Sequence, residues 1–505
     1  MPIDTTVLQT QLQSVTATTL LQLEQVATTM EVINNSLSVT TVPKAAALPS
    51  ASANTGSYIF SLAEKQMWFS NGTSWVSAAA PALSNDPTNG STSLLASAAS
   101  ANSITTIANS AIAQAVLTQT HELWMCGYNG TGALGQGSPN GGIQSFNMVE
   151  GENWAQAVTN GLTTLAVDAN GNLWGWGGDF NGGWWEQYNS NNTQYSPWML
   201  DAPVSTTYDA EGVTQTGWRS VAISKATNPF NPQHVAAIDN SGHVWCWGYN
   251  SYGELGNNST TNSFTPAQVT GFPNPIVQVS CGYCSTMAID SAGGLWAWGL
   301  NDLGQLGTND TNNYSTPTYI SGGWSSVSMG NFSVAGIKVD GTLWTWGLND
   351  QGQLGQGGSG FGGSFSTPQQ VTSPSQNWAQ CSMGYQNLCA VTTTGALWGS
   401  GYNGNGELGL GSTTPAISMT QEATYGTNWT SVASGENHTL GVQQLFGGKY
   451  LYSTGLNTNY QLGNPVISGS AYMMTQVPIY PNVQYISAGG NSSLLITSSL
   501  YGKAS

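Results

Sequence analysis

Charged side chains are scarce in this 505-residue chain: Asp, Glu, Lys and Arg together make up 6% of it, against roughly 25% in an ordinary soluble protein. Basic residues are the scarcest, with Lys and Arg totalling 7 against 24 Asp and Glu, so the formal net charge is −17. Such a surface repels phosphate backbones and is wetted mainly by amide and hydroxyl groups. Nucleic acid is therefore excluded as an expected partner.

Long apolar runs are missing as well. No run approaches the length of a membrane span, and the first residues, MPIDTT, lack the basic and apolar regions of a signal peptide. The 6 cysteines are too few for a disulfide scaffold in a chain of this length. Disorder is disfavoured too, because 39% hydrophobic residues, among them 20 Trp and 20 Tyr, can bury a large core. We expect a folded chain without a membrane span or an evident secretion signal.

Glycine, by contrast, is abundant at 63 residues, and much of it belongs to an internal repeat. The segment LWTWGLNDQGQLG at 343–355 places two tryptophans one residue apart and ends in Gly-x-Leu-Gly. Six related segments, two of them divergent, begin at residues 123, 173, 244, 295, 397 and 451. The glycines that close the Trp-x-x-Gly or Tyr-x-x-Gly element are Gly127, Gly177, Gly248, Gly299, Gly347, Gly401 and Gly455. Five of the six intervals lie between 48 (347 − 299) and 54 (401 − 347) residues, and the second is 71 (248 − 177).

The repeat has the periodicity of β-strands. Within 295–299, the side chains of Trp296 and Trp298 point to one face and the residues between and beside them to the other. Short segments upstream of the Trp-Gly strands end in turns that carry Asp168, Asp239, Asp290 and Asp340. We interpret these carboxylates as hairpin-turn residues and not as catalytic groups. A period near fifty residues favours a four-stranded blade over a two-helix repeat.

These segments resemble the repeats of the regulator of chromosome condensation family, in which a Trp-Gly strand is followed by Asn-x-x-Gly-x-Leu-Gly. The resemblance covers about residues 121–505. It implies a seven-bladed β-propeller, an architecture whose radial closure removes long exposed sheet edges. The chain enters the repeat array at His121, within a Trp-Gly element, and the segment 483–503 has strands without that element. We therefore predict that the two ends share one blade.

Residues 1–120 differ in character. We predict a helical oligomerisation and attachment segment at 1–43, a linker at 44–91 with a small β module at 57–78, and a second helix at 92–120. The oligomerisation seams repeat at alternating spacings of 3 and 4 residues; they comprise Leu23, Val26, Met30, Ile33 and Leu37, then Ile104, Ala108, Ala111 and Ala115. A lone amphipathic surface helix is the alternative for the first seam. The expected fold is thus mainly β: a seven-bladed propeller with an N-terminal α-helical coiled-coil stalk and a small β module.

No familiar catalytic or metal-binding pattern is present. Cys281 and Cys284 have the spacing of a metal or redox pair, but no second pair accompanies them and no histidine lies at ligand spacing beside them. We interpret both as buried cysteines of a propeller strand. The sequence predicts no catalytic residue, no metal, no cofactor and no enzymatic activity.

The interval of 71 (248 − 177) residues contains an aromatic insertion at 178–200. Its candidate ligand-binding residues are Trp184, Trp185, Tyr188, Tyr195 and Trp198. Aromatic side chains with amide neighbours on a long loop stack on sugars or form hot spots for a protein. Packing of the insertion onto its own blade is an equal alternative.

The order of stalk and head and the amide-rich surface resemble bacteriophage tail fibres and other virion appendages. We expect a non-enzymatic, outward-facing virion appendage whose stalk forms a homo-oligomer, by preference a trimer, on other virion proteins. Its propeller would bind a host-surface glycan or protein. A capsid head fibre or decoration protein and a secreted propeller inhibitor or adhesin are alternatives. The resemblance to the founding family member implies another, a guanine-nucleotide exchange factor for a small GTPase, although this chain lacks a basic arm.

Overall fold

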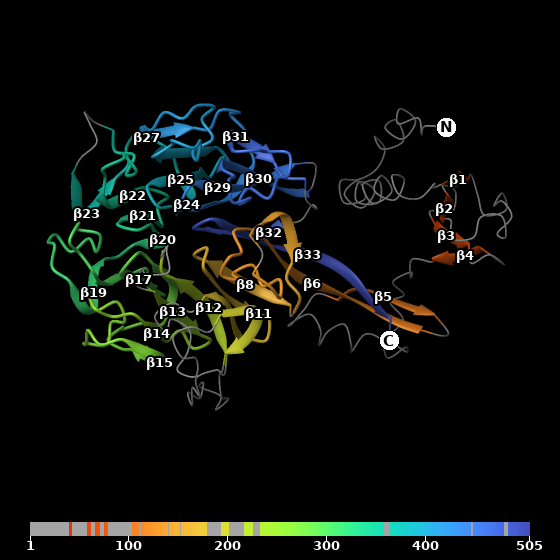
Figure 1. The fold of residues 1–505 in the computed structure, drawn as a ribbon, viewed down its shortest axis with the longest axis horizontal. Coiled ribbons are helices and arrows are strands. Elements are labelled where there is room, and N and C mark those ends of the chain that lie inside the picture. Colours follow the sequence, from red (N-terminus) through yellow and green to blue (C-terminus); the bar gives the residue numbers. More distant parts are fainter. Residues whose placement is uncertain are drawn as a thin grey trace. The chain divides into compact units, whose positions relative to one another are not determined.

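The computed structural model of the chain (Figure 1) describes most of the repeat region. Residues described with their side chains are 121–139, 141–151, 153–178, 194–200, 217–225, 233–357, 363–445, 448–478 and 483–497. Strand backbone alone is described at 40–42, 58–61, 66–70, 75–78, 104–110, 113–120, 193 and 498–504. The chain divides into two compact units, one of residues 1–118 with 502–505 and the other of residues 119–501.

The larger unit is a ring of seven antiparallel sheets, and the colours of the sequence run once round it in Figure 1. Blade 2 consists of β8 (Trp154–Thr159), β9 (Thr163–Asp168), β10 (Leu173–Gly178) and β11 (Thr193–Leu200). Blade 3 consists of β12 (Trp218–Ile223), β13 (His234–Asp239), β14 (Val244–Gly248) and β15 (Ser263–Val269). Blade 4 consists of β16 (Ile276–Cys281), β17 (Ser285–Asp290), β18 (Leu295–Gly299) and β19 (Tyr314–Ser321).

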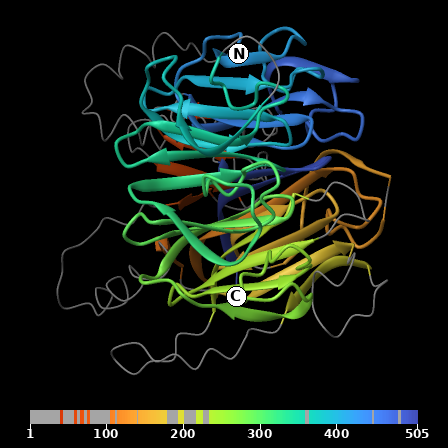
Figure 2. The same ribbon diagram turned by 90° about the vertical axis from the view of Figure 1, so that its left-hand side faces the viewer.

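The next three blades repeat this plan of four consecutive strands, which Figure 2 shows from the side. Blade 5 consists of β20 (Trp324–Met329), β21 (Ser333–Lys338), β22 (Leu343–Leu348) and β23 (Ser364–Gln370). Blade 6 consists of β24 (Trp378–Met383), β25 (Asn387–Thr392), β26 (Leu397–Gly401) and β27 (Ala416–Gln421). Blade 7 consists of β28 (Trp429–Ser434), β29 (His438–Leu445), β30 (Gly448–Leu456) and β31 (Ser470–Gln476).

Blade 1 closes the ring with strands from both ends of the repeat array. It joins β32 (Val483–Gly489) and β33 (Ser492–Ala504) to β6 (Ala113–Gly127), and β7 (Ile143–Met148) pairs with β6. The first strand of each blade contacts the first strand of the next, and β32 contacts β8 to complete the circle. The predicted seven-bladed propeller and its shared closing blade are both confirmed.

The helix predicted at 92–120 is wrong over 104–110 and 113–120, and the rest of it lies outside the described residues. Residues 104–110 form β5 (Ile104–Ser110), which pairs antiparallel with the first part of β6, so that Ile104 lies opposite Thr118 and Ala108 opposite Ala115. The alanine spacing suggested a helix face, but the run Ile-Thr-Thr-Ile is β-branched throughout and favours strand. The strand β5 is also stabilised by its pairing with β6, which continues to Gly127, and the spacing of the alanines along the sequence does not reveal this partner. Ala111 lies outside the described residues.

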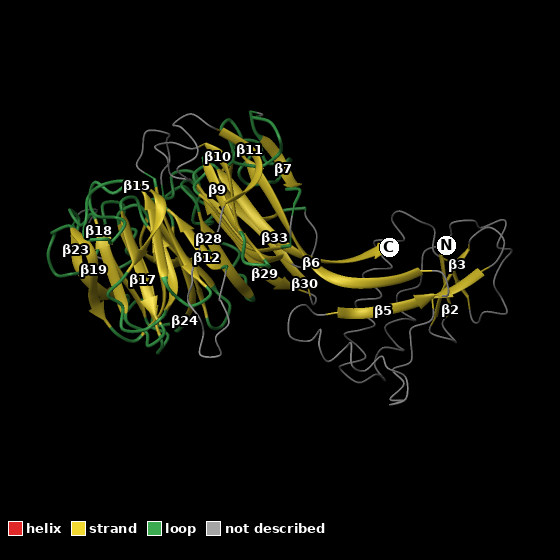
Figure 3. Cartoon of the chain, turned by 90° about the horizontal axis from the view of Figure 1, so that it is seen from below, coloured by secondary structure: helices red, strands yellow, loops and turns green. Residues whose placement is uncertain are grey.

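The predicted hairpin at 57–78 is found as β3 (Gln66–Ser70) and β4 (Trp75–Ala78), which pair antiparallel across the Asn71-Gly72 segment. Their sheet is extended by β2 (Tyr58–Ser61) and by β1 (Thr40–Val42), which pairs with β2 in parallel. The expected coiled-coil seam from Leu23 to Leu37 lies outside the described residues. Figure 3 shows strands and loops throughout the described part, in which no helix occurs.

In six of the seven repeats an asparagine holds the loop after the Trp-Gly strand. In blade 4 the fully buried Asn301 accepts a hydrogen bond on Oδ1 from the Leu306 N–H at 2.8 Å, and its Nδ2 donates to the Asp310 carbonyl at 3.0 Å. The matching asparagines accept from the leucine N–H five residues later; they are Asn129, Asn250, Asn349, Asn403 and Asn457. This bond turns the leucine into the core, which is why Asn and Leu recur together.

In three blades the second tryptophan of the repeat ties the blade to the one before. Trp298 of blade 4 donates from Nε1 to the carbonyl of Glu254 in the loop of blade 3 at 2.7 Å. Trp176 and Trp346 make the same bond to blades 1 and 4. All three indoles are fully buried. In these three blades the Trp-Gly segment therefore carries an interblade contact.

Candidate functional site

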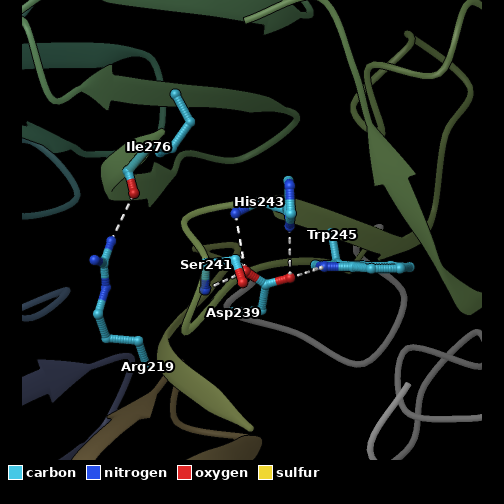
Figure 4. A network of polar contacts seen from close by, with 6 residues as sticks. All are labelled: Arg219, Asp239, Ser241, His243, Trp245 and Ile276. Atoms are coloured by element: carbon cyan, nitrogen blue, oxygen red, sulfur yellow. Dashed lines mark hydrogen bonds and ion pairs between the residues drawn. The ribbon is translucent and has the colours of Figure 1, made fainter. Parts of the chain in front are cut away.

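The turn carboxylates are structural, as predicted. Asp239 accepts on Oδ1 from the N–H groups of Ser241 and His243, both at 2.9 Å, and on Oδ2 from Trp245 Nε1 at 3.1 Å (Figure 4). His243 Nδ1 lies 3.0 Å from the same Oδ2. Asp168 and Asp290 bind the N–H groups of their own turns and the first tryptophan in the same way. The carboxylate oxygens of Asp239 are thus already occupied by donors of their own hairpin.

Both cysteines are buried, as predicted, although only Cys281 lies in a strand. Cys281 ends β16 with 2% of its surface exposed, and Cys284 is fully buried in the next loop. Burial raises the pKa of the Cys281 thiol to about 12 and that of Cys284 further still. Both are therefore protonated thiols at neutral pH, which are poor metal ligands and poor nucleophiles. Among the described residues, no group of three or more His, Cys, Asp and Glu is placed to hold a metal ion.

The aromatic insertion is described in part. Trp184, Trp185 and Tyr188 lie outside the described residues, whereas Tyr195 and Trp198 lie on β11 with 36% and 50% of their surfaces exposed. The Tyr195 ring lies against Gly132 of blade 1, and its carbonyl accepts from Gly137 N–H at 2.7 Å. This part of the insertion therefore packs on the neighbouring blade. Ligand binding by the five aromatic residues stays a prediction.

The loops between the first and second strands meet at one end of the ring axis. A small pocket there, which we call the axial mouth, is lined by Asn160, Lys225, Asn331, Tyr385, Gly435, Glu436, Gly489 and Gly490. Since these residues come from six different blades, the pocket lies on the axis. The loops approach so closely that a methyl group on Gly330 would overlap the carbonyl oxygen of Gly384. Glycine at this position lets backbone groups pack around the axis.

Lys225 is the exceptional residue of the axial mouth. Its side chain is largely buried, and burial lowers the pKa of its ammonium group. No hydrogen bond or ion pair joins this ammonium to any residue that the structure describes. The segment that follows it, ATNPFNP at 226–232, contains no carboxylate. Glu436 lines the same mouth, and burial raises the pKa of its carboxyl group.

Buried polar atoms that have no hydrogen-bond partner among the described residues lie around the mouth, in the first residues of the second strands and the loops before them. They are Gln233 Nε2, Asn331 Oδ1, Asn387 Oδ1 and Nδ2, and His438 Nδ1. His438 Nε2 and Ser493 Oγ form a hydrogen bond of 2.8 Å. Burial lowers the pKa of the His438 imidazole to about 4. The imidazole is therefore neutral at physiological pH. Unsatisfied buried groups are costly, so a ligand that reached these atoms would complete their hydrogen bonds.

Sequence reasoning missed the axial mouth. Aligning the repeats on the last residue of the first strand would have placed Lys225 in register with Tyr283, Asn331, Tyr385 and Glu436. A lysine in that ring, in a chain with so few basic residues, was the available signal. Spacing alone does not show that these loops converge.

Two curated relatives resemble parts of the chain. Over 219 residues it is 30% identical to the probable E3 ubiquitin-protein ligase HERC4 of Mus musculus, which covers 42% of this chain and 18% of the relative. Over 209 residues it is 26% identical to the ultraviolet-B receptor UVR8 of Arabidopsis thaliana, which covers 40% of this chain and 43% of the receptor. The matches span less than half the length of either relative.

Solved structures show the same fold. Human WBSCR16 aligns with a TM-score of 0.63 at 18% identity, covering 75% of this chain and 99% of that one. The yeast protein RCC1 (Prp20), solved bound to Kap60, aligns with a TM-score of 0.63 at 21% identity, covering 76% and 90%. The family model of the RCC1-like domain matches residues 82–420 and 230–503, well over half of the chain. These matches confirm the resemblance drawn from the repeats: the chain belongs to the RCC1-like domain family.

Proposed function

We propose that this chain is a binding protein and not an enzyme, and that a partner protein docks on the end of the propeller that carries the axial mouth. The observation that carries the proposal is Lys225, a largely buried ammonium group without a described partner. A carboxylate side chain of the partner would reach into the mouth and pair with it. Charge-assisted hydrogen bonds of this kind are roughly twice as strong as neutral ones.

The orientation of the closing strands supports this choice of face. Gly127, at the end of β6, lies against Asn491 and Ser492 beside the mouth. Because β6 ends there and β33 begins there, the other ends of both strands lie at the opposite end of the sheet. Gln119 of β6 and Tyr501 of β33 are at that opposite end. Within this unit, the chain thus enters and leaves the closing sheet at the end opposite the mouth.

Replacing Lys225 by methionine is expected to leave the free protein as stable as wild type, or more stable, while abolishing partner binding. The physical reason is that a buried ammonium without a partner opposes folding, and methionine removes that charge at similar volume. Thermal unfolding measures the first effect. The second is measured by affinity capture from an extract of the source organism, with wild type, Lys225→Met and Lys449→Met immobilised in parallel.

Lys449, on β30 in blade 7, is the matched control because it carries the same charge outside the mouth. A protein retained by wild type and Lys449→Met but lost with Lys225→Met would support the proposal. Capture that is equal on all three, or a large fall in melting temperature for Lys225→Met, would show that the lysine has a structural role instead.

A second candidate, the exchange factor for a small GTPase, is favoured by the likeness to Prp20p of Saccharomyces cerevisiae. The solved structure of that protein is described together with its binding to Gsp1p and histones. Release of a fluorescent GDP analogue from Gsp1p tests this activity directly. Acceleration of at least about tenfold by wild type, lost in Lys225→Met, would favour exchange at the axial mouth, whereas an unchanged release rate would argue against it.

Placement on a virion, as a tail fibre or a capsid head fibre, rests on the sequence alone. The strand pairing of β5 with β6 removes one of the two helices that were expected to form the stalk. The trimeric stalk and its seam at Leu23 to Leu37 stay predictions. Sedimentation of the purified full chain measures them, because an elongated trimer is expected and a monomer would contradict the stalk.

A further inference from the structure

Blade 5 differs from blades 2, 3 and 4 at the last residue of its second strand, and it is the one blade with a charged base there, since blades 6, 7 and 1 have Thr392, Gln443 and Thr497. In blades 2, 3 and 4 the residue opposite the start of the first strand is an aspartate that accepts from a tryptophan Nε1; these are Asp168, Asp239 and Asp290. In blade 5 the same register places Lys338 opposite Trp324. A base thus replaces the acid of the hairpin in this blade.

The ammonium of Lys338 is held by two indole faces. Its Nζ lies 4.4 Å from the ring centroid of Trp344 and 5.1 Å from that of Trp324. Both indole N–H groups donate elsewhere, Trp344 to Thr342 Oγ1 at 2.8 Å and Trp324 to Ser321 Oγ at 3.0 Å. Cation–π contacts position the charge without using its three N–H donors. Those donors are free to face a ligand.

The lysine opens onto a hollow of about 370 Å³ between blades 4 and 5. Its other walls include Asn309, Tyr314, Tyr319 and Ser321 from blade 4. Tyr319 is 54% exposed, with its ring 5.2 Å from that of Trp296, which supports it from its own blade. A cation, an exposed aromatic ring and several amide and hydroxyl groups thus surround a space within the usual size range of a ligand pocket.

Two carboxylates beside the hollow limit the charge that it accepts. Asp310 receives hydrogen bonds from Thr308 Oγ1 at 2.7 Å and the Tyr314 hydroxyl at 2.8 Å, which lower its pKa. Asp340 receives two from Thr342, which lower its pKa likewise. Neither forms an ion pair with Lys338. Ionised acids nearby disfavour a polyanion, so the site suits a ligand with one carboxylate and an otherwise neutral, polar body.

We propose that this hollow binds an acidic sugar of the hexuronic acid type. Its carboxylate pairs with Lys338, its apolar ring face lies on Tyr319, and its hydroxyls exchange hydrogen bonds with Asn309 and the polar groups of β19. This site is separate from the axial mouth and does not depend on the function proposed for it. The same chemistry is offered by a free uronic acid and by a uronic acid at the end of a polysaccharide.

The test is a titration of the full chain with glucuronic acid and, as the matched neutral probe, glucose, followed by saturation-transfer NMR and calorimetry. Glucuronic acid is expected to bind at least about tenfold more tightly than glucose, a difference of one charge-assisted pair. Lys338→Gln should weaken glucuronic acid at least about tenfold and leave glucose unchanged. Lys449→Gln, in blade 7, should change neither.

Tyr319→Ala supplies a second variant at an exposed position, where folding is least affected. It should weaken both sugars while melting temperature stays close to wild type. Equal binding of the two sugars, undiminished binding of glucuronic acid by Lys338→Gln, or no binding of glucuronic acid at millimolar concentration would each overturn the proposal. Tight binding of a uronic-acid oligosaccharide with weak binding of the monosaccharide would support it and identify the polymer as the source.

Discussion

Replacing Gly248 by alanine is expected to lower the free energy of unfolding by about 4 kcal/mol or more, among the largest effects of any single methyl group in this chain. Gly248 closes the Trp-Gly element of blade 3 with a φ of 105°. A methyl group there would overlap the carbonyl oxygen of Gln233 and lie 2.9 Å from the His234 Cα. Both neighbours are backbone atoms at the start of β13 or directly before it, and they cannot move without disturbing the β13–β14 pairing.

Gly271→Ala is the matched control, because Gly271 has a φ of 103° but open space where the methyl group would be. It carries the same backbone strain without the overlap, so its cost should be about 1–2 kcal/mol. Urea unfolding followed by tryptophan fluorescence measures both variants. If Gly248→Ala loses no more stability than Gly271→Ala, close backbone approach is not the reason that glycine recurs in the repeat.

The propeller was predictable because the residues that recur in the repeats are the ones that make the contacts of a blade. The asparagine, leucine and tryptophan of a segment such as 295–307 form the loop and interblade bonds that make one blade, and seven copies are enough to close a ring. The turn position of Asp239 followed from local hairpin chemistry in the same way. Local sequence patterns therefore predict the fold correctly where the hydrogen bonds of the patterned residues lie within one repeat or between consecutive repeats.

The errors and omissions concern contacts between distant parts of the chain. Residues 104–110 were expected to be helical because alanine spacing was considered without the strand partner, which lies in β6. Lys225 was missed because its surroundings are built by loops from five other blades. Lys338 was missed because it is unusual only in the strand register, where it occupies the position that Asp168, Asp239 and Asp290 have in other blades. Three-dimensional convergence and register, and not composition, reveal both of these lysines.

Replacing Glu254 by glutamine is expected to stabilise the protein by about 2–3 kcal/mol at pH 8 and to change little at pH 4. Glu254 is fully buried in the Gly-x-Leu-Gly loop of blade 3, where its Oε2 accepts from Tyr252 N–H at 2.8 Å. Burial raises the pKa of its carboxyl group to about 7. The folded chain therefore holds this proton more tightly than the unfolded one, whose glutamate pKa is about 4.3. The resulting stabilisation is complete below about pH 4 and is lost as the pH rises to about 7.

The repeat itself supplies the reciprocal experiment, since Gln305 occupies the same position in blade 4 and accepts from Leu303 N–H at 2.9 Å. Its Nε2 has no hydrogen-bond partner in the part of the chain that the structure describes, so Gln305→Glu loses no described hydrogen bond of the amide nitrogen and adds a buried carboxyl group. We expect Gln305→Glu to be less stable than wild type at pH 8 and nearly equal at pH 4, the mirror image of Glu254→Gln. Thermal unfolding of wild type and both variants across this range separates charge from packing. A packing effect would give differences that do not change with pH, whereas a titrating carboxyl group requires them to grow between about pH 4 and pH 7.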